Sequence, residues 1–226
     1  MNYVETLLWY LGNIWEYTIQ MLPCMGLALV MFCLISPLRR KHLARLQLES
    51  GPWRECALLV FVMFSAGLAS LTLFPANFWS RILEYLLVPE ARAYGLDLSS
   101  FYPSWEEILV QTDDRNLFTP FQEIHRGLTR GPWVFFMLLG NIGMFLPIGF
   151  FPALLWRKPR WWKSMLLGAL TSTTIEFVQF FIGRSTDIDD VILNTTGSLI
   201  GYWMFWLLRK LLPGWTQKFQ CHERDV

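Results

Sequence analysis

The stretch Cys56-Ala-Leu-Leu-Val-Phe-Val-Met-Phe-Ser-Ala-Gly-Leu-Ala-Ser-Leu-Thr-Leu-Phe74 contains no charged residue. At about 1.5 Å per residue, a helix of this length crosses a hydrocarbon core roughly 30 Å thick. Backbone N–H and C=O groups find no water in lipid, so a spanning segment is either a helix or a strand of a closed barrel. A continuous apolar run lacks the alternation of a barrel strand. The stretch therefore predicts a transmembrane helix.

Four other segments have the same character, at residues 18–36, 134–156, 164–182 and 191–212. The composition agrees, because 54% of the residues are hydrophobic and 16% are charged, against about 25% charged residues in a typical soluble domain. The net charge of +1 provides no basic face, so nucleic-acid binding is excluded. We expect an all-α, polytopic membrane helix bundle of about five transmembrane helices.

Most Lys and Arg residues fall between the first and second spans, between the third and fourth, and after the fifth. They are Arg39, Arg40, Lys41, Arg45 and Arg54; Arg157, Lys158, Arg160 and Lys163; and Arg209, Lys210, Lys218 and Arg224. Positive residues are retained on the cytoplasmic side of a membrane. We therefore expect a multi-pass protein of the cytoplasmic membrane, with the N-terminus outside and the C-terminus in the cytoplasm.

In this orientation the connection of residues 76–132 lies outside, and six of its apolar residues recur at helical spacing. They are Phe78, Trp79, Ile82, Leu83, Leu86 and Leu87. The pattern predicts an amphipathic helix lying along the membrane surface, and Ser104-Trp-Glu-Glu107 is typical of a capping box that opens a second helix. The alternative role is a lid without chemistry of its own.

The chain then divides into four parts. Residues 1–75 hold two transmembrane helices and a cytoplasmic basic loop, and residues 76–132 form the amphipathic connection. Residues 133–215 form a three-helix core, and residues 216–226 form a cytoplasmic tail.

Polar residues inside the spans indicate where a site lies. Glu176 sits roughly 9 Å below the outer end of its span, where a carboxylate costs several kcal/mol unless it faces a partner or a polar cavity. Gln179, Thr173 and Ser172 are spaced to extend the same helix face. Asn141, in the preceding span, lies at a similar depth. Gly140 and Gly143 flank it, and such small residues suit a packed seam.

The turn Gly183-Arg-Ser-Thr-Asp-Ile-Asp-Asp190 places three carboxylates within four positions. Asp187 or Asp189 is suited to cap the fifth helix. Asp190 and Asn194 share a face with Gly197, and Gly197 with Gly201 predicts a close contact with a neighbouring helix.

Topology thus predicts that one polar pocket gathers residues from three spans and this turn. Its members are Asn141, Glu176, Gln179, Arg184, Asp187, Asp190 and Asn194. The alternative is that the amides form ordinary bonds between helices and that the aspartates only cap a helix.

These residues carry a resemblance to a known family. Asn116-Leu-Phe-Thr-Pro-Phe121, Asn141-Ile-Gly-Met-Phe-Leu-Pro-Ile-Gly149, Thr174-Ile-Glu-Phe-Val-Gln179, the aspartate turn and Asn194-Thr-Thr-Gly197 occur in the order seen in VanZ-like proteins. The first motif departs by an extra residue, Thr119. The resemblance implies a small bacterial integral membrane protein linked to glycopeptide antibiotics such as teicoplanin, which act on lipid-linked cell-wall precursor outside the membrane.

Two main functions follow. In the first, the pocket binds the head group of a membrane lipid, a lipid-linked precursor or a lipidated antibiotic. Arg184 would pair with a phosphate or carboxylate, and the expected binding residues are Asn116, Asn141, Gln179, Arg184 and Asn194. In the second, the protein is a hydrolase or transferase acting on a lipid pyrophosphate or glycan.

In the enzyme reading, Glu176 would be the general base and Asp187 and Asp190 further catalytic residues. Asp187, Asp189 and Asp190 would hold Mg2+ through oxygen ligands. A transporter ranks last, because the inner halves of the spans hold few polar groups.

Overall fold

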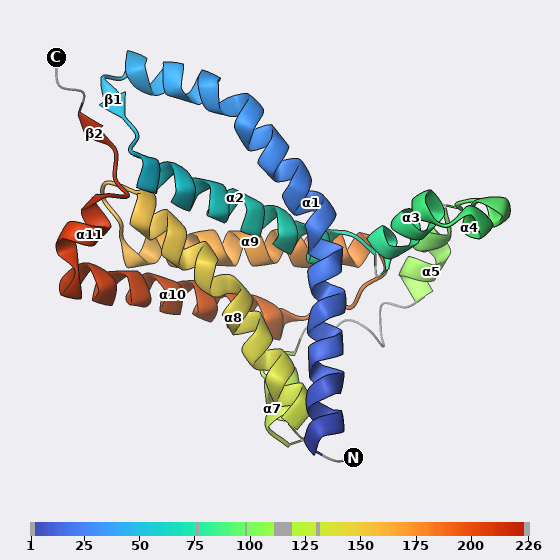
Figure 1. The fold of residues 1–226 in the computed structure, drawn as a ribbon. Coiled ribbons are helices and arrows are strands. Elements are labelled where there is room, and N and C mark those ends of the chain that lie inside the picture. Colours follow the sequence, from blue (N-terminus) through green and yellow to red (C-terminus); the bar gives the residue numbers. More distant parts are fainter. Residues whose placement is uncertain (1–2, 76, 98, 111–118, 130–131, 224–226) are drawn as a thin grey trace.

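The computed structural model describes residues 3–75, 77–97, 99–110, 119–129 and 132–223. Its framework is a set of long helices (Figure 1). They are α1 (Tyr3–Arg45), α2 (Pro52–Leu73), α8 (Pro132–Leu155), α9 (Trp161–Phe181) and α10 (Ile188–Leu211). The expected all-α membrane bundle is confirmed.

Within the described ranges, four segments are long and apolar enough to cross a membrane. They are Tyr17–Arg45 of α1, Pro52–Leu73, Phe135–Leu155 of α8 and Ile188–Leu211. The fifth expected span corresponds to α9, which has a similar length of 21 residues. This helix is less apolar because buried polar side chains line one of its faces, among them Ser172, Glu176 and Gln179.

The first helix is much longer than the span expected at residues 18–36. It continues through Pro23 and Pro37 without a break. Proline interrupts backbone hydrogen bonds, but transmembrane helices tolerate it where neighbouring groups satisfy the freed carbonyls. The helix α1 extends beyond the apolar run of residues 18–36 in both directions.

The core forms where α8 and α10 cross at glycines. A Cβ atom on Gly197 would collide with the carbonyl of Ile142, and one on Gly201 with the carbonyl of Leu146. On α8, Gly149 meets the backbone of Ser198 in the same way. The seam expected at Gly197 and Gly201 is confirmed.

The related expectation for Gly140 and Gly143 was wrong. A Cβ atom on either would meet nothing within 4 Å. The contacts with α10 run along α8 from Ile142 to Phe150, so Gly143 lies within the crossing but on a face turned away from α10, and Gly140 lies just before it.

Two apolar clusters occupy the interior. Leu68, Phe145, Ile148 and Ile175 form one, and Ala57, Ala153, Leu154, Phe205 and Phe219 form the other. Many large apolar side chains point outward instead, including Leu27, Leu170 and Phe177, each more than half exposed. Such a surface is normal when lipid is the solvent.

The connection after α2 folds into short helices. They are α3 (Phe78–Leu87), α4 (Pro89–Tyr94), the 3-10 turn η1 (Ser99–Phe101), α5 (Trp105–Val110) and α7 (Gln122–Thr129). The helix expected from Phe78 onward is α3. The capping box is also confirmed, since Ser104 N–H donates to Glu107 Oε2 at 2.8 Å and Glu107 N–H donates to Ser104 Oγ at 3.3 Å.

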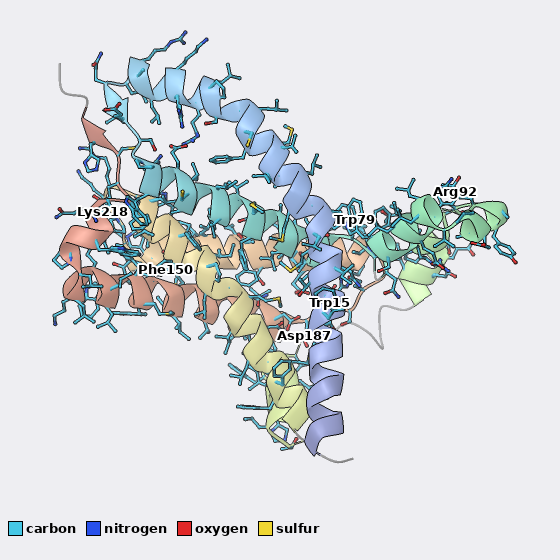
Figure 2. The ribbon with its side chains drawn as sticks, in the orientation of Figure 1. Trp15, Trp79, Arg92, Phe150, Asp187 and Lys218 are labelled. Atoms are coloured by element: carbon cyan, nitrogen blue, oxygen red, sulfur yellow. The ribbon has the colours of Figure 1, made fainter. Side chains whose placement is uncertain are left out.

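The connections rich in Lys and Arg meet at one end of the bundle, which we call the basic end (Figure 1). Arg39 of α1 pairs there with Glu55 of α2. Strand β1 (Leu48–Glu49) pairs antiparallel with β2 (His222–Glu223), after α11 (Pro213–Gln217). Lys218 marks this end in Figure 2, whereas Trp79 and Asp187 lie toward the other.

Candidate functional site

The buried carboxylate of Glu176 lies away from the basic end and points at the aspartate turn. Only 6% of the residue is exposed, and its Oε2 accepts the backbone N–H of Asp187 at 2.9 Å. Asp190, Asp187 and Arg184 are near enough to interact with it electrostatically. The side chain therefore faces polar partners rather than lipid.

The three aspartates of the turn serve different partners. Asp187 caps α10 by accepting the N–H of Asp189 at 2.8 Å. Asp190 Oδ1 accepts a hydrogen bond from Asn141 Nδ2 of α8. Asp189 is fully buried and turns toward α7.

This divergence bears on the Mg2+ site expected at Asp187, Asp189 and Asp190. In the described part of the chain, no group of three or more His, Cys, Asp or Glu side chains is placed to hold a metal ion. The three carboxylates are therefore not gathered around a common point, as a shared Mg2+ site requires.

Asp189 has a role that sequence reasoning missed. Its two carboxylate oxygens accept the N–H groups of Phe121 and Ile124 at the start of α7. The first backbone N–H groups of a helix lack internal partners, and a negative charge there is favourable. One feature of the sequence could have indicated this role. Phe121, just before α7, has no side-chain oxygen to cap this helix, so the helix needs an acceptor from elsewhere.

Arg184 joins the turn to α2. Its Nη1 donates to the carbonyls of Leu71 at 2.6 Å and Phe74 at 3.4 Å. The last carbonyls of a helix lack internal partners and favour a cation. Burial lowers the pKa of the guanidinium, while Tyr17, Glu176 and Asp190 favour its charged form.

The backbone around Gly183 sets this position. Gly183 adopts φ 71° just after α9, a left-handed conformation that glycine takes without a Cβ penalty. The N–H of Arg184 then returns to the carbonyl of Gln179 at 3.0 Å. The turn thereby directs the arginine back across the end of α2.

A second polar layer lies nearer the basic end. Asn194 Nδ2 donates to Ser172 Oγ at 2.9 Å, and Ser198 Oγ donates to the carbonyl of Ser164 at 2.7 Å. Asn194 Oδ1 is buried without a partner among the described residues. Ser172 is fully buried, but Thr173 is exposed, so the expectation that Thr173 extends the Glu176 face was wrong.

The structure thus brings together most residues that the sequence singled out. We call Asn141, Glu176, Arg184, Asp187, Asp189 and Asp190 the polar cluster. Gln179 is buried beside it on α9, and Asn194 lies in the second layer. Asn116 lies outside the described residues. Tyr17 of α1 is a further neighbour of Arg184 that no motif indicated.

The comparisons with known proteins bear on this arrangement. A family model described as VanZ/LLP1 matches residues 61–209. The chain belongs to the VanZ-like family. The match runs from α2 to α10, so it extends toward the N-terminus beyond the motifs recognised in the second half of the sequence. No curated protein and no solved structure matches the chain.

The VanZ-like motifs meet at the aspartate turn. Phe121 of the first motif is bonded to Asp189, Asn141 of the second to Asp190, and Glu176 of the third to the N–H of Asp187. Segments far apart in this VanZ-like membrane protein therefore share one hydrogen-bonded site.

Proposed function

We propose that this VanZ-like protein binds the polar head group of a membrane lipid, a lipid-linked cell-wall precursor or a lipidated glycopeptide antibiotic at the polar cluster. The cluster faces the outer side of the bacterial cytoplasmic membrane in the orientation that the basic residues favour. Glycopeptide antibiotics reach the lipid-linked precursor on that side. VanZ-like membership implies a link to these antibiotics.

The arrangement of Arg184 is the observation that carries the proposal. Nη1 is held by the carbonyls of Leu71 in α2 and of Phe74 just after this helix, whereas Nε and Nη2 make no hydrogen bond with any described residue. A guanidinium presents its N–H groups in a planar fork that matches phosphate and carboxylate oxygens. One edge therefore fixes the side chain and the other can receive an anionic head group.

The acidic neighbours do not prevent this. Asp187 and Asp189 accept backbone N–H groups at the starts of α10 and α7, where helix dipoles offset negative charge. Asp190 bonds an amide. The remaining hydrogen-bonding capacity of Glu176, Gln179 and Asn141 suits sugar or amide groups of the same ligand.

These bonds also favour binding over the hydrolase or transferase hypothesis. Asp187 and Asp190, expected as catalytic residues beside Glu176, each hold a structural hydrogen bond. A general base must reach the proton that it removes. Conversion of the ligand to a product is therefore one outcome of the binding experiment below.

The test measures binding to the purified protein in nanodiscs. The probes are a radiolabelled lipid-linked precursor with a pyrophosphate head, teicoplanin, and a zwitterionic phospholipid as reference. Arg184→Gln removes hydrogen bonds to a charged group worth about 1.5–3 kcal/mol, so affinity for the true ligand should fall about ten- to a hundredfold.

Arg184→Lys keeps the charge but loses the fork, so it should recover only part of the affinity. Arg157→Gln, an exposed arginine at the basic end, is the matched control and should bind normally. Equal binding by Arg184→Gln and the unmodified protein would refute the proposal. Product formation abolished in Glu176→Gln would instead establish the enzyme.

A further inference from the structure

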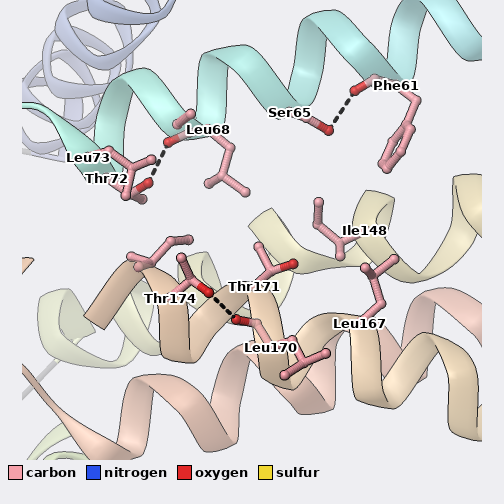
Figure 3. A pocket seen from close by; sticks show the side chains of 12 residues that line it. Phe61, Ser65, Leu68, Thr72, Leu73, Ile148, Leu167, Leu170, Thr171 and Thr174 are labelled. Atoms are coloured by element: carbon pink, nitrogen blue, oxygen red, sulfur yellow. Dashed lines mark hydrogen bonds between the residues drawn. The ribbon is translucent and has the colours of Figure 1, made fainter. Parts of the chain in front are cut away.

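An elongated cavity of about 380 Å³ runs between α2 and α9, with α8 behind it. Figure 3 shows Phe61 and Leu68 on the α2 side and Thr171 on the α9 side of this groove. The lining is mainly aliphatic and aromatic. We call it the α2–α9 groove.

Three of the four hydroxyl groups in this lining already donate within their own helices, and Thr171 carries the fourth. Ser65 Oγ donates to the carbonyl of Phe61, Thr72 Oγ1 to that of Leu68, and Thr174 Oγ1 to that of Leu170, each at 2.8 Å (Figure 3). Each bond stays within one helix. The walls therefore present chiefly hydrocarbon to whatever fills the groove.

The size of the groove selects among apolar occupants. A helix with its side chains is about 10–12 Å across. A helix of that width running along the groove would need more than the 380 Å³ that the cavity provides. The lining runs along α2 from Phe61 to Leu73, roughly 18 Å at 1.5 Å per residue. One leaflet is about half of a 30 Å hydrocarbon core. A single lipid chain fits this length.

One end of the groove adjoins the polar cluster. Ile175 lines the groove and is followed by Glu176. Leu73 also lines the groove. In the sequence it stands between Leu71 and Phe74, whose carbonyls accept hydrogen bonds from Arg184. A chain in the groove would thus carry an attached head group to the guanidinium.

We infer that the α2–α9 groove holds one hydrocarbon chain of an anionic membrane lipid whose head group lies at Arg184. The inference rests on the proposed function and narrows its ligand class to a molecule with both an anionic head and a long chain. The groove binds the hydrocarbon chain by burying its apolar surface, and the guanidinium selects lipids with an anionic head group.

The experiment uses the full-length protein in nanodiscs with a phosphatidylglycerol that carries a photoreactive diazirine in one acyl chain. After irradiation, the labelled peptides are identified by mass spectrometry. Labelling should concentrate on the facing stretches of α2 and α9 and saturate at one lipid per protein. Equal labelling of the groove and of the other lipid-facing surfaces would overturn the inference.

A filled groove provides the matched comparison. Thr171→Trp places a large ring in the groove and should reduce groove labelling by about tenfold, a loss of roughly 1.4 kcal/mol in binding. Leu166→Trp adds the same ring on α9 at an exposed position outside the lining and should leave labelling unchanged. Ser65→Trp tests the α2 wall if Thr171→Trp does not fold. Unreduced labelling in a folded groove variant would contradict chain binding.

Arg184→Gln separates this inference from the proposed function. Loss of preference for phosphatidylglycerol over phosphatidylcholine, together with groove labelling, supports both. Groove labelling with an unaltered preference supports chain binding and contradicts head-group recognition by Arg184. Altered preference without groove labelling supports the polar cluster and refutes the groove.

Discussion

Asp189 shows how one residue can satisfy a helix distant in sequence. It is fully buried, and it accepts an N–H from Phe121, 68 positions earlier. A buried carboxylate is costly unless it is well bonded, and here the N-terminus of α7 supplies the bonds. The residue ties the connection before α8 to the turn before α10.

Asp189→Ala should therefore destabilise the protein. It leaves the partly buried N–H groups of Phe121 and Ile124 without an acceptor, a cost of about 1–3 kcal/mol. Unfolding of the detergent-solubilised protein measures the change in the free energy of unfolding. Hydrogen exchange of the Phe121 and Ile124 amides reports the loss of the cap at the start of α7. Both amides should exchange faster.

Glu106→Ala, at an exposed position, is the control and should change the stability little. If Asp189→Ala keeps both the stability and the amide protection, the cap does not hold α7 in place.

The sequence identified the members of the polar cluster better than their partners. Glu176, Asn141 and Arg184 stood out because polar groups near apolar spans are costly. Their partners depend on how the turn folds, and the sequence did not show that. Three close aspartates therefore suggested a shared metal, whereas the folded turn sends their side chains to α10, α7 and α8.

At the scale of elements, glycines gave an ambiguous signal. Gly197 and Gly143 both lie in apolar helices with another small residue nearby, yet only Gly197 touches a neighbouring backbone. Spacing reveals that two small residues share a helix face, but not which face a neighbouring helix covers. The lengths of α2, α8, α9 and α10 were more predictable, since the hydrocarbon thickness sets them, whereas α1 continues beyond its apolar run.

Gly197→Ala and Gly143→Ala form a matched pair. The first forces α8 and α10 apart and should cost about 1–3 kcal/mol through overpacking. The second meets open space and should be neutral or stabilise by up to about 1 kcal/mol through helix propensity. Thermal unfolding in one detergent compares them. Equal effects of the two substitutions would show that the crossing does not lie at Gly197.

At the scale of the whole molecule, the bundle has two chemically different ends. The basic connections gather at one, and the polar cluster with the short helices α3, α4 and α5 lies toward the other (Figure 1). Charge counting predicted this separation because each crossing of the membrane places successive connections on opposite sides. The α2–α9 groove was not predictable, since its shape depends on side-chain packing between helices that are distant in sequence.

Labelling of single cysteines tests the orientation. In a variant without native cysteines, Glu90→Cys in α4 should react with a membrane-impermeant maleimide in intact cells. Lys158→Cys at the basic end should react only after permeabilisation, because positive residues stay in the cytoplasm. Both positions are exposed, so access to the reagent decides the result. The reverse pattern would invert the topology and place the polar cluster inside.

The carboxyl-terminal tail and Arg184 attach to opposite ends of the same helix. Near the start of α2, Phe219 packs with Ala57 and its ring meets Trp53. At the other end, Arg184 holds the carbonyls of Leu71 and Phe74. Because α2 forms one wall of the α2–α9 groove, contacts at both of its ends set the position of that wall. Residues far from the groove on either side thereby help to define its width.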